Sequence, residues 1–316
     1  MSKKPAKKRP AQPSGPPPEL PPSWPDRRAL EKSLADIGRL LSEREFASME
    51  EVNAFLDELM ASGKPIEAPP RTPLEEAQDL MYEAWEAKGR RRVELARRAL
   101  EISPDCADCY VLLAEETART LEQARDLYEQ GVKAGERAIG PEAFKEYAGD
   151  FWGMLETRPY MRARAGLAEV LWLLGERQQA IGHLREMLRL NPNDNQGLRY
   201  ILMDWLQDEG DDQALGELLH RYEGDYSAQW LYTNALWRYR REGPKRKANR
   251  ALKDALEENR FVPDYLLGRK RIPRRLPEYI SFGGEDEAQS YAAGAVEAWR
   301  RTEGALAWLA QQVQAR

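Results

Sequence analysis

The chain has little of what disulfide-bonded, metal-binding and membrane-spanning proteins use. Its 316 residues include only two cysteines and two histidines, too few for a disulfide framework or a structural zinc site. The longest apolar runs, such as 170–174, are far shorter than the roughly 20 residues that cross a bilayer as a helix. So few cysteines also suit a reducing compartment. We therefore expect a cytoplasmic protein that binds no metal and spans no membrane.

Motifs that signal catalysis are missing as well. The sequence holds neither a phosphate-binding P-loop nor a GxSxG nucleophile elbow. Cys106 and Cys109 have the spacing of redox and zinc motifs, but no strand pattern and no second ligand pair accompany them. Their plainer interpretation is two small residues near the start of a helix. We expect no enzymatic activity, no catalytic residue and no cofactor.

The N-terminal part of the chain changes composition twice. Residues 1–26 contain mostly Pro, Lys, Ser and Gly, cannot offset the entropy of ordering, and are predicted to be a disordered tail. Apolar residues at helical spacing predict a helical hairpin in 27–63, and Ser48 with Glu51 forms a capping-box pattern before its second helix. The prolines of 64–74 predict a linker. The apolar positions are Leu30, Leu34, Ile37, Leu40 and Leu41, then Val52, Phe55, Leu56 and Leu59.

Residues 161–194 carry the clearest repeat. Gly175, Ala180 and Pro192 stand at the offsets of one unit of a tetratricopeptide repeat, which is a pair of antiparallel helices. The same register continues forward through two further units, and two weaker units precede an insertion at 137–158. The sequence therefore predicts five helix pairs.

One such pair cannot bury its apolar face alone, so neighbouring pairs must stack. We predict an all-α protein, a right-handed superhelix of tetratricopeptide-type helix pairs spanning 75–263. The N-terminal helical hairpin lies before it. A loop and two capping helices occupy 264–316, where apolar residues alternate with charges at helical spacing.

Two segments resemble a known family. Residues 99–136 contain CADCYVLLAEE and end in KAGE, and they are similar to the repeat region of the suppressor-of-tumorigenicity-seven family. A second set is similar to that family's carboxyl segment in order and spacing: Asn259, Val262, Pro263, Tyr265, Leu266, Leu267, Pro277, Ile280, Gly283, Glu287, Ala288, Tyr291, Trp299 and EGAL at 303–306. The resemblance covers about 92–310 and implies no reaction. Residues 151–172 also resemble a block of bacterial tetratricopeptide proteins.

The tetratricopeptide geometry implies which side chains line a binding groove. Positions 2, 5, 9 and 12 of the first helix in each pair face the concave side. Large aromatic side chains and Arg are typical of interface hot spots. The residues selected in this way are Arg162, Glu169, Trp172, Arg199, Met203, Trp230, Trp237 and Arg240. Two alternatives stay open: Trp172 and Trp237 pack between helices, and Arg162 and Arg199 form intramolecular ion pairs.

Two further regions are candidates for partner contact. Trp152 and Arg158 belong to an aromatic and charged cluster at the end of the insertion, which either binds a partner or packs onto the repeats with Arg158 paired to an acid. Residues 238–275 hold fourteen Lys and Arg against five Asp and Glu, although the chain as a whole has a net charge of −5. This excess of positive charge indicates an acidic partner or plain solvation.

We therefore expect a cytoplasmic, non-enzymatic scaffold that binds a peptide or protein segment with acidic groups in the concave groove. The alternative is an RNA-associated adaptor that uses the basic region 238–275.

Overall fold

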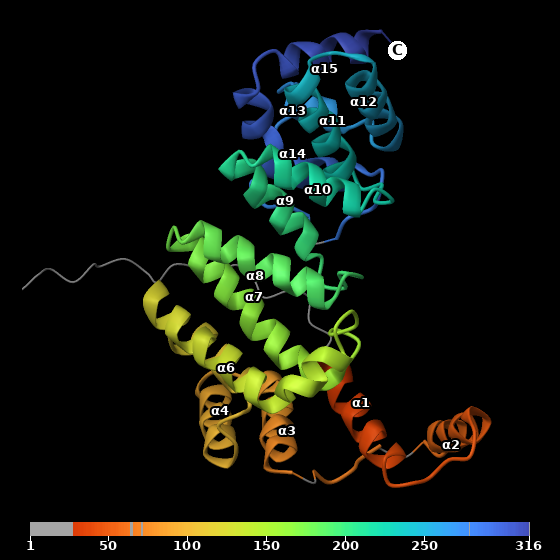
Figure 1. Cartoon of the computed structure of the whole chain (residues 1–316), viewed down its shortest axis with the longest axis vertical. Coiled ribbons are helices and arrows are strands. Elements are labelled where there is room, and N and C mark those ends of the chain that lie inside the picture. Colours follow the sequence, from red (N-terminus) through yellow and green to blue (C-terminus); the bar gives the residue numbers. More distant parts are fainter. Residues whose placement is uncertain (1–27, 64–65, 71, 278, 316) are drawn as a thin grey trace, which may run out of the picture. The chain divides into compact units, whose positions relative to one another are not determined.

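The computed structural model describes residues 28–63, 66–70, 72–277 and 279–315 (Figure 1). Among these residues all regular structure is helical, so the all-α fold class predicted from the sequence is confirmed. The predicted tail 1–26 lies outside the described residues. The chain divides into two compact units, of which unit 1 ends at Asn193 and unit 2 begins at Asp194.

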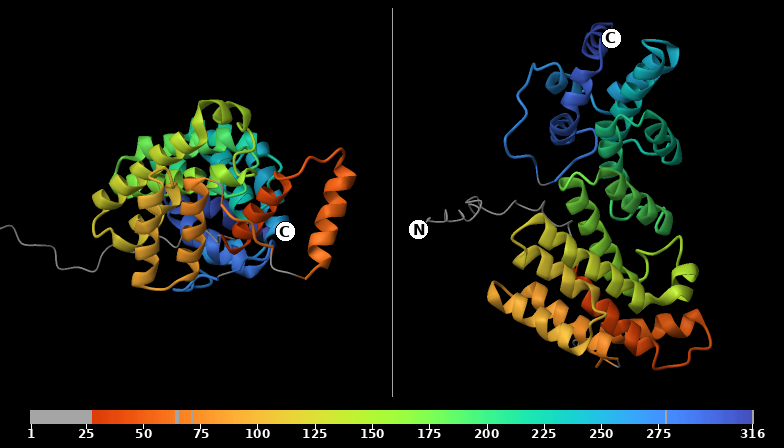
Figure 2. Two further views of the ribbon diagram at one scale, coloured as in Figure 1. Left: turned by 90° about the horizontal axis from the view of Figure 1, so that it is seen from below. Right: turned by 60° about the vertical axis from the view of Figure 1, so that its left-hand side comes forward.

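Unit 1 contains three consecutive helix pairs (Figures 1 and 2). Small residues such as Ala77, Ala96 and Ala99 are completely buried where the helices of the first two pairs pack against one another. Within each of the three pairs the two helices pack against each other, as the repeat spacing predicted. The helices are α3 (Pro73–Glu86), α4 (Arg90–Ile102), α5 (Ala107–Thr117), α6 (Leu121–Glu146), α7 (Arg158–Leu173) and α8 (Arg177–Leu190).

The predicted insertion 137–158 packs onto unit 1. It begins inside α6, which kinks where Gly140 takes a φ of 74° ahead of Pro141, and it ends with a 3-10 turn, η1 (Leu155–Thr157). The ring of Phe151 is fully buried, with its centroid 6.1 Å from that of Tyr160 on α7. The insertion therefore extends the apolar core of unit 1.

Unit 2 contains two helix pairs followed by three further helices. Helix α14 packs against α9 and α11 as well as α13, and Trp299 and Trp308 join α11 and α12 in one apolar core. The predicted capping helices are thus present. The helices are α9 (Leu198–Glu209), α10 (Asp212–Arg221), α11 (Ala228–Glu242), α12 (Arg246–Glu258), α13 (Val262–Leu266), α14 (Glu285–Arg301) and α15 (Ala305–Gln314).

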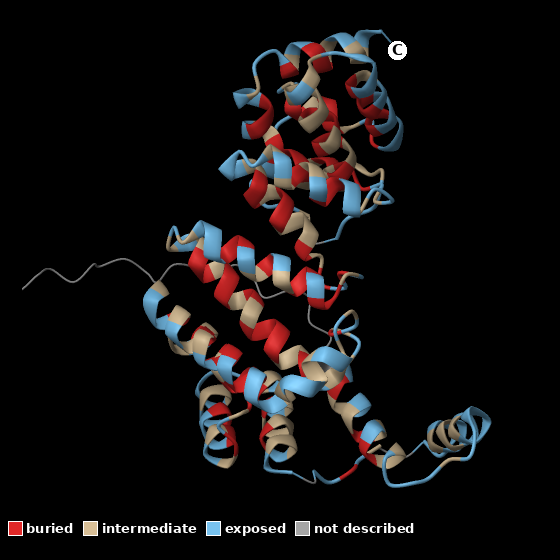
Figure 3. Ribbon diagram, viewed as in Figure 1, coloured by how far each residue is buried: buried red, intermediate tan, exposed pale blue. Residues whose placement is uncertain are grey.

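Two helices precede the repeats, α1 (Arg28–Leu41) and α2 (Met49–Ala61). The Ser48 hydroxyl accepts a hydrogen bond from the Glu51 amide, and the Glu51 carboxylate accepts one from Ala47, so the predicted helix start is confirmed. Helix α2 has no buried residue (Figure 3). Helix α1 packs against α3, a contact that the sequence did not predict.

Candidate functional site

In unit 1, α5 and α7 meet α1 through a buried ion-pair network. The Arg162 guanidinium on α7 donates to both carboxylate oxygens of Asp108 on α5, at 2.8 and 2.6 Å. It also donates to both oxygens of Glu31 on α1, each at 3.1 Å. All three side chains are buried. We call the surface made by α3, α5 and α7 the α3–α5–α7 face.

Arg158, one turn before Arg162 on α7, forms the edge of this network. Its guanidinium donates to Glu31 at 3.0 Å and to the carbonyl oxygen of Trp152 at 2.9 Å, and it lies 5.4 Å from the centroid of the Trp152 ring. The acid that pairs with Arg158 is therefore Glu31. The cluster predicted at the end of the insertion is engaged within unit 1.

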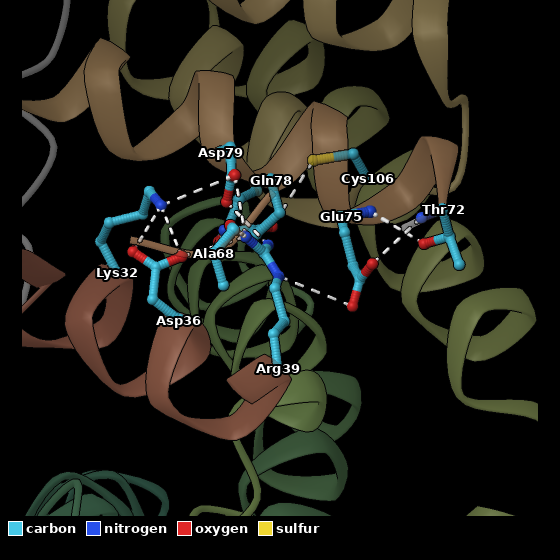
Figure 4. Close-up of polar contacts among 10 residues, drawn as sticks. Lys32, Asp36, Arg39, Ala68, Thr72, Glu75, Gln78, Asp79 and Cys106 are labelled. Atoms are coloured by element: carbon cyan, nitrogen blue, oxygen red, sulfur yellow. Dashed lines mark hydrogen bonds and ion pairs between the residues drawn. The ribbon is translucent and has the colours of Figure 1, made fainter. Parts of the chain in front are cut away.

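A second ionic contact holds the other end of α1 (Figure 4). Arg39 donates to both oxygens of Asp79 on α3, at 2.9 and 2.8 Å, and to the carbonyl oxygen of Ala68 at 3.1 Å. The hydrogen bond to Asp79 raises the pKa of Arg39 against the opposing effect of burial. Lys32 donates to Asp36 at 2.7 Å on the same side of α1.

Helix α1 therefore places its charged face inward and its apolar face outward. Among the side chains of α1 that the structure describes, those of Glu31, Asp36 and Arg39 are buried. Leu30 and Leu34, in contrast, are 57% and 45% exposed. The apolar spacing that predicted this helix ordinarily marks the buried side of an amphipathic helix. Here the opposite side is buried, because the α3–α5–α7 face offers charged partners.

The remaining predicted residues of unit 1 lie further along α7. Glu169 and Trp172 are half-buried, and the guanidinium of Arg177 lies 4.5 Å from the centroid of the Trp172 ring. One α-helical turn covers 3.6 residues, so both side chains are about two to three turns beyond Arg162.

In unit 2, the predicted arginines form intramolecular ion pairs. Arg199 on α9 pairs with Asp194 at 3.0 Å and with Asp225 at 2.9 Å. Arg240 on α11 pairs with Asp212 at 2.6 Å. For Arg162 and Arg199 alike, the structure contains the ion-pair alternative that the sequence left open.

Three predicted apolar residues of unit 2 are engaged in packing. Met203 and Trp230 are buried, and the Trp230 ring makes edge contacts with Tyr200 and Tyr222, both with centroids 6.0 Å apart. The half-buried Trp237 donates its indole N–H to the carbonyl oxygen of Asp212 at 2.7 Å. For Trp237, the structure contains the packing alternative that the sequence left open.

Helix α14 explains why the first helices of unit 2 are so covered. Arg301 near its carboxyl end donates to Asp208 of α9 at 3.1 Å, and a side chain at Gly294 would lie 4.0 Å from the Asp204 carboxylate. Burial raises the pKa of Asp204 to about 7, with Asp208 adding to the effect. The capping prediction was correct in placing two helices here but did not foresee that α14 reaches α9.

The basic region 238–275 is distributed over α11, α12 and the segment after α13. Two of its charges pair with acids outside the region: Arg240 lies 2.6 Å from Asp212, and Lys270 lies 2.6 Å from Glu285. Arg269 to Arg271 are exposed. The charge excess seen in the sequence is thus partly matched within unit 2.

Features of metal, redox or membrane sites are sparse among the described residues. Cys106 and Cys109 are free thiols with 1% and 0% exposure, and burial raises the pKa of the Cys109 thiol. No cluster of three or more His, Cys, Asp or Glu with metal-binding geometry occurs in the described part of the chain. None of the described helices combines the length and apolarity needed to cross a bilayer.

The fold and its contacts define a helical-repeat protein. Residues 71–190 match the family described as ST7 protein. The chain is 32% identical over 254 residues to the suppressor of tumorigenicity 7 protein-like of Bos taurus, with 72% of this chain and 45% of that protein covered. It is 29% identical over 284 residues to the suppressor of tumorigenicity 7 protein of Macaca fascicularis, covering 74% and 52%. The resemblance to this family predicted from the sequence is confirmed.

The matches cover only part of each relative. The human suppressor of tumorigenicity 7 protein-like is 32% identical over 254 residues, and 43% of it is covered, so the chain spans about half the length of the curated relatives it matches. The solved structure of YrrB, described as a TPR protein with an unusual peptide-binding site, is 20% identical. It covers 58% of this chain and 84% of its own, with a TM-score of 0.39.

Sequence reasoning missed Glu31, Asp108 and the pair of Arg39 with Asp79. Glu31 lies 131 positions from Arg162, so no local pattern joins them. One signal was present in the sequence: Glu31 and Arg39 are eight residues apart and therefore share a face of α1.

Proposed function

We propose that this protein is a non-enzymatic interaction scaffold whose α3–α5–α7 face binds a helical protein segment carrying a carboxylate. The observation that supports this function is the contact of Glu31 with Arg158 and Arg162 at 3.0 and 3.1 Å. Helix α1 already binds in the manner that the sequence assigned to a partner. Its acidic group meets the arginines of a first helix, Arg158 and Arg162, through hydrogen bonds between charged groups.

The chemistry of the contact favours exchange of α1 for a partner. Its buried residues are charged, and the Coulomb energy of a buried ion pair is largely offset by the cost of desolvating both groups. Helix α14 covers the first helices of unit 2 with apolar side chains, among them Tyr291, Ala295 and Trp299, and apolar burial stabilises by about 25 cal/mol per Å². We therefore assign α14 a permanent role and α1 an exchangeable one.

A labelled peptide tests the proposal on the full chain. The probe is a fluorescein-labelled peptide of residues 28–44, and the receptor is the Glu31→Lys variant, whose own α1 brings a positive charge toward Arg158 and Arg162. We expect fluorescence anisotropy to report binding to this variant. Binding to the wild-type chain should be at least about tenfold weaker, because its tethered α1 competes at high effective concentration.

Two controls make the assay specific. A peptide with glutamine in place of Glu31 should bind the variant several-fold more weakly, because a hydrogen bond between charged groups is lost. Adding Arg162→Gln to the Glu31→Lys chain should remove most of the binding. If the Glu31→Lys chain keeps its helical circular dichroism and still binds neither peptide, the proposed function is wrong.

A further inference from the structure

Helix α1 presents an apolar stripe on the side opposite its ion pairs. Leu30, Leu34, Ile37 and Leu41 follow one another at intervals of four, three and four residues, the spacing of a coiled-coil seam. Leu30 and Leu34 are exposed, and Ile37 and Leu41 are half-buried. Because the ion pairs fix the charged side of α1 to unit 1, this stripe is held outward on an ordered helix.

We propose that the stripe pairs with the same stripe of a second copy of this chain, with the two α1 helices antiparallel. The intervals of four, three and four read the same in both directions. An antiparallel pair therefore sets Leu30 against Leu41 of the partner subunit, and Leu34 against Ile37 of the partner subunit. Such a contact is isologous, as the two-fold symmetry of most homodimers requires.

The residues beside the stripe fit a second copy. Ser33 and Gly38 are exposed and uncharged. In the antiparallel pair, Ser33 lies opposite Gly38 of the partner subunit. A side chain at Gly38 would meet no atom within 4 Å, so the approach is open. Like charges facing each other across a helix pair are destabilising, and none stands at these two positions.

Within the same chain, helix α2 is the alternative partner for the stripe of α1. Part of the apolar side of α2 is already in contact with neighbouring residues. Phe55 packs against Phe46, with ring centroids 5.7 Å apart, and the Arg44 guanidinium lies 4.3 Å from the Phe55 ring. Helix α2 also carries Glu50, Glu51, Asp57 and Glu58 and no basic residue. A second α1 is therefore the better complement.

The size of the contact predicts a weak, reversible dimer. Helix α1 has 14 residues, so the seam is about 21 Å long. A single helix pair of that length falls below the roughly 1,200–2,000 Å² of a stable specific interface. The pairing uses none of the residues that join α1 to the α3–α5–α7 face, and it does not depend on the proposed function.

Sedimentation equilibrium of the full chain over a wide concentration range tests the dimer. We expect the wild type to move from monomer toward dimer with concentration, and Leu34→Asp to raise the dissociation constant by at least about tenfold, because apolar burial is lost on both sides. Leu34→Ala should act in the same direction but less. Leu173→Asp is the matched control, since Leu173 is 49% exposed on α7 and should leave dimerisation unchanged.

Disulfide trapping tests the orientation. The natural cysteines are 1% and 0% exposed, so a cysteine introduced at Ser33 or Gly38 is the accessible thiol of each variant. Mixing Ser33→Cys chains with Gly38→Cys chains under mild oxidation should give mainly the mixed disulfide. Mainly homodisulfides would overturn the antiparallel arrangement. A wild-type chain that stays monomeric at every concentration would overturn the proposal, as would a dimer unaffected by Leu34→Asp.

Discussion

Replacing Arg162 by glutamine is the most direct perturbation of the buried ion-pair network. The guanidinium bridges Asp108 and Glu31, whose side chains are 0% and 4% exposed. Glutamine keeps some hydrogen-bonding capacity but removes the charge. Asp108 then loses the cation that offsets its desolvation and keeps only the hydrogen bond from Gln78 at 2.8 Å, whereas Glu31 loses one of its two arginines and keeps Arg158 at 3.0 Å.

The expected cost follows from this geometry. Removing one partner of a buried ion pair destabilises a protein by about 3–5 kcal/mol, a large part of the 5–15 kcal/mol that stabilises a typical domain. Glu31→Gln should cost less, about 1.5–3 kcal/mol, because Arg162 keeps both contacts with Asp108. Which of the two variants loses more stability tests the reasoning as directly as the size of each loss.

Urea unfolding of the full chain, with hydrogen exchange of α7 peptides followed by mass spectrometry, measures the cost in unit 1. Arg137→Gln is the control, because Arg137 pairs with Asp105 at 2.7 Å with both side chains exposed, and an exposed pair contributes at most about 1 kcal/mol. Equal costs for Arg162→Gln and Arg137→Gln would refute the reasoning.

Three further predictions concern other parts of the chain. Since the folded pKa of Asp204, about 7, lies above its unfolded value, unit 2 should lose stability as pH rises from about 4 to 7, and Asp204→Asn should remove this decline in thermal unfolding midpoints. Gly166→Ala should destabilise by about 1–3 kcal/mol in denaturant unfolding, since its Cβ would lie within 3 Å of the Tyr128 ring. Gly182→Ala, which meets no atom within 4 Å, should stabilise by about 0.5–1 kcal/mol. Both cysteines, being buried, should react with a thiol reagent only after denaturation, and rapid labelling of the native chain would contradict this.

The helix pairs were predictable because their signals are local. Gly175 takes a φ of 83° at the turn between α7 and α8, which explains why a glycine marks that position of the repeat. Ala180 is fully buried where the two helices cross. Residues within one thirty-four-residue unit determine both features, so a single sequence suffices to find them.

The candidate site was harder to predict because it joins distant segments through charges. An apolar stripe at helical spacing indicates a helix, but it indicates the buried side only when apolar surface is available to cover it. In α1 the covering surface offers Arg162 and Asp79, so the charged side turns inward. The partner-facing role given to Arg162 from the sequence did identify the residue that α1 contacts, although Glu31 itself was not foreseen.

The two proposals are coupled through α1, and their coupling is itself testable. A partner helix must replace docked α1, so a docking free energy of about 2 kcal/mol lowers its apparent affinity about thirtyfold. Pairing of two α1 helices orders both and therefore favours their docked state. The labelled 28–44 peptide should consequently bind wild-type chain less well, per chain, as the total chain concentration rises. In Leu34→Asp this dependence should vanish, because α1 then docks without a second copy. If the apparent affinity for the peptide does not change with chain concentration in either the wild type or Leu34→Asp, dimerisation and partner binding are not coupled. Docking of α1 is then a property of the single chain.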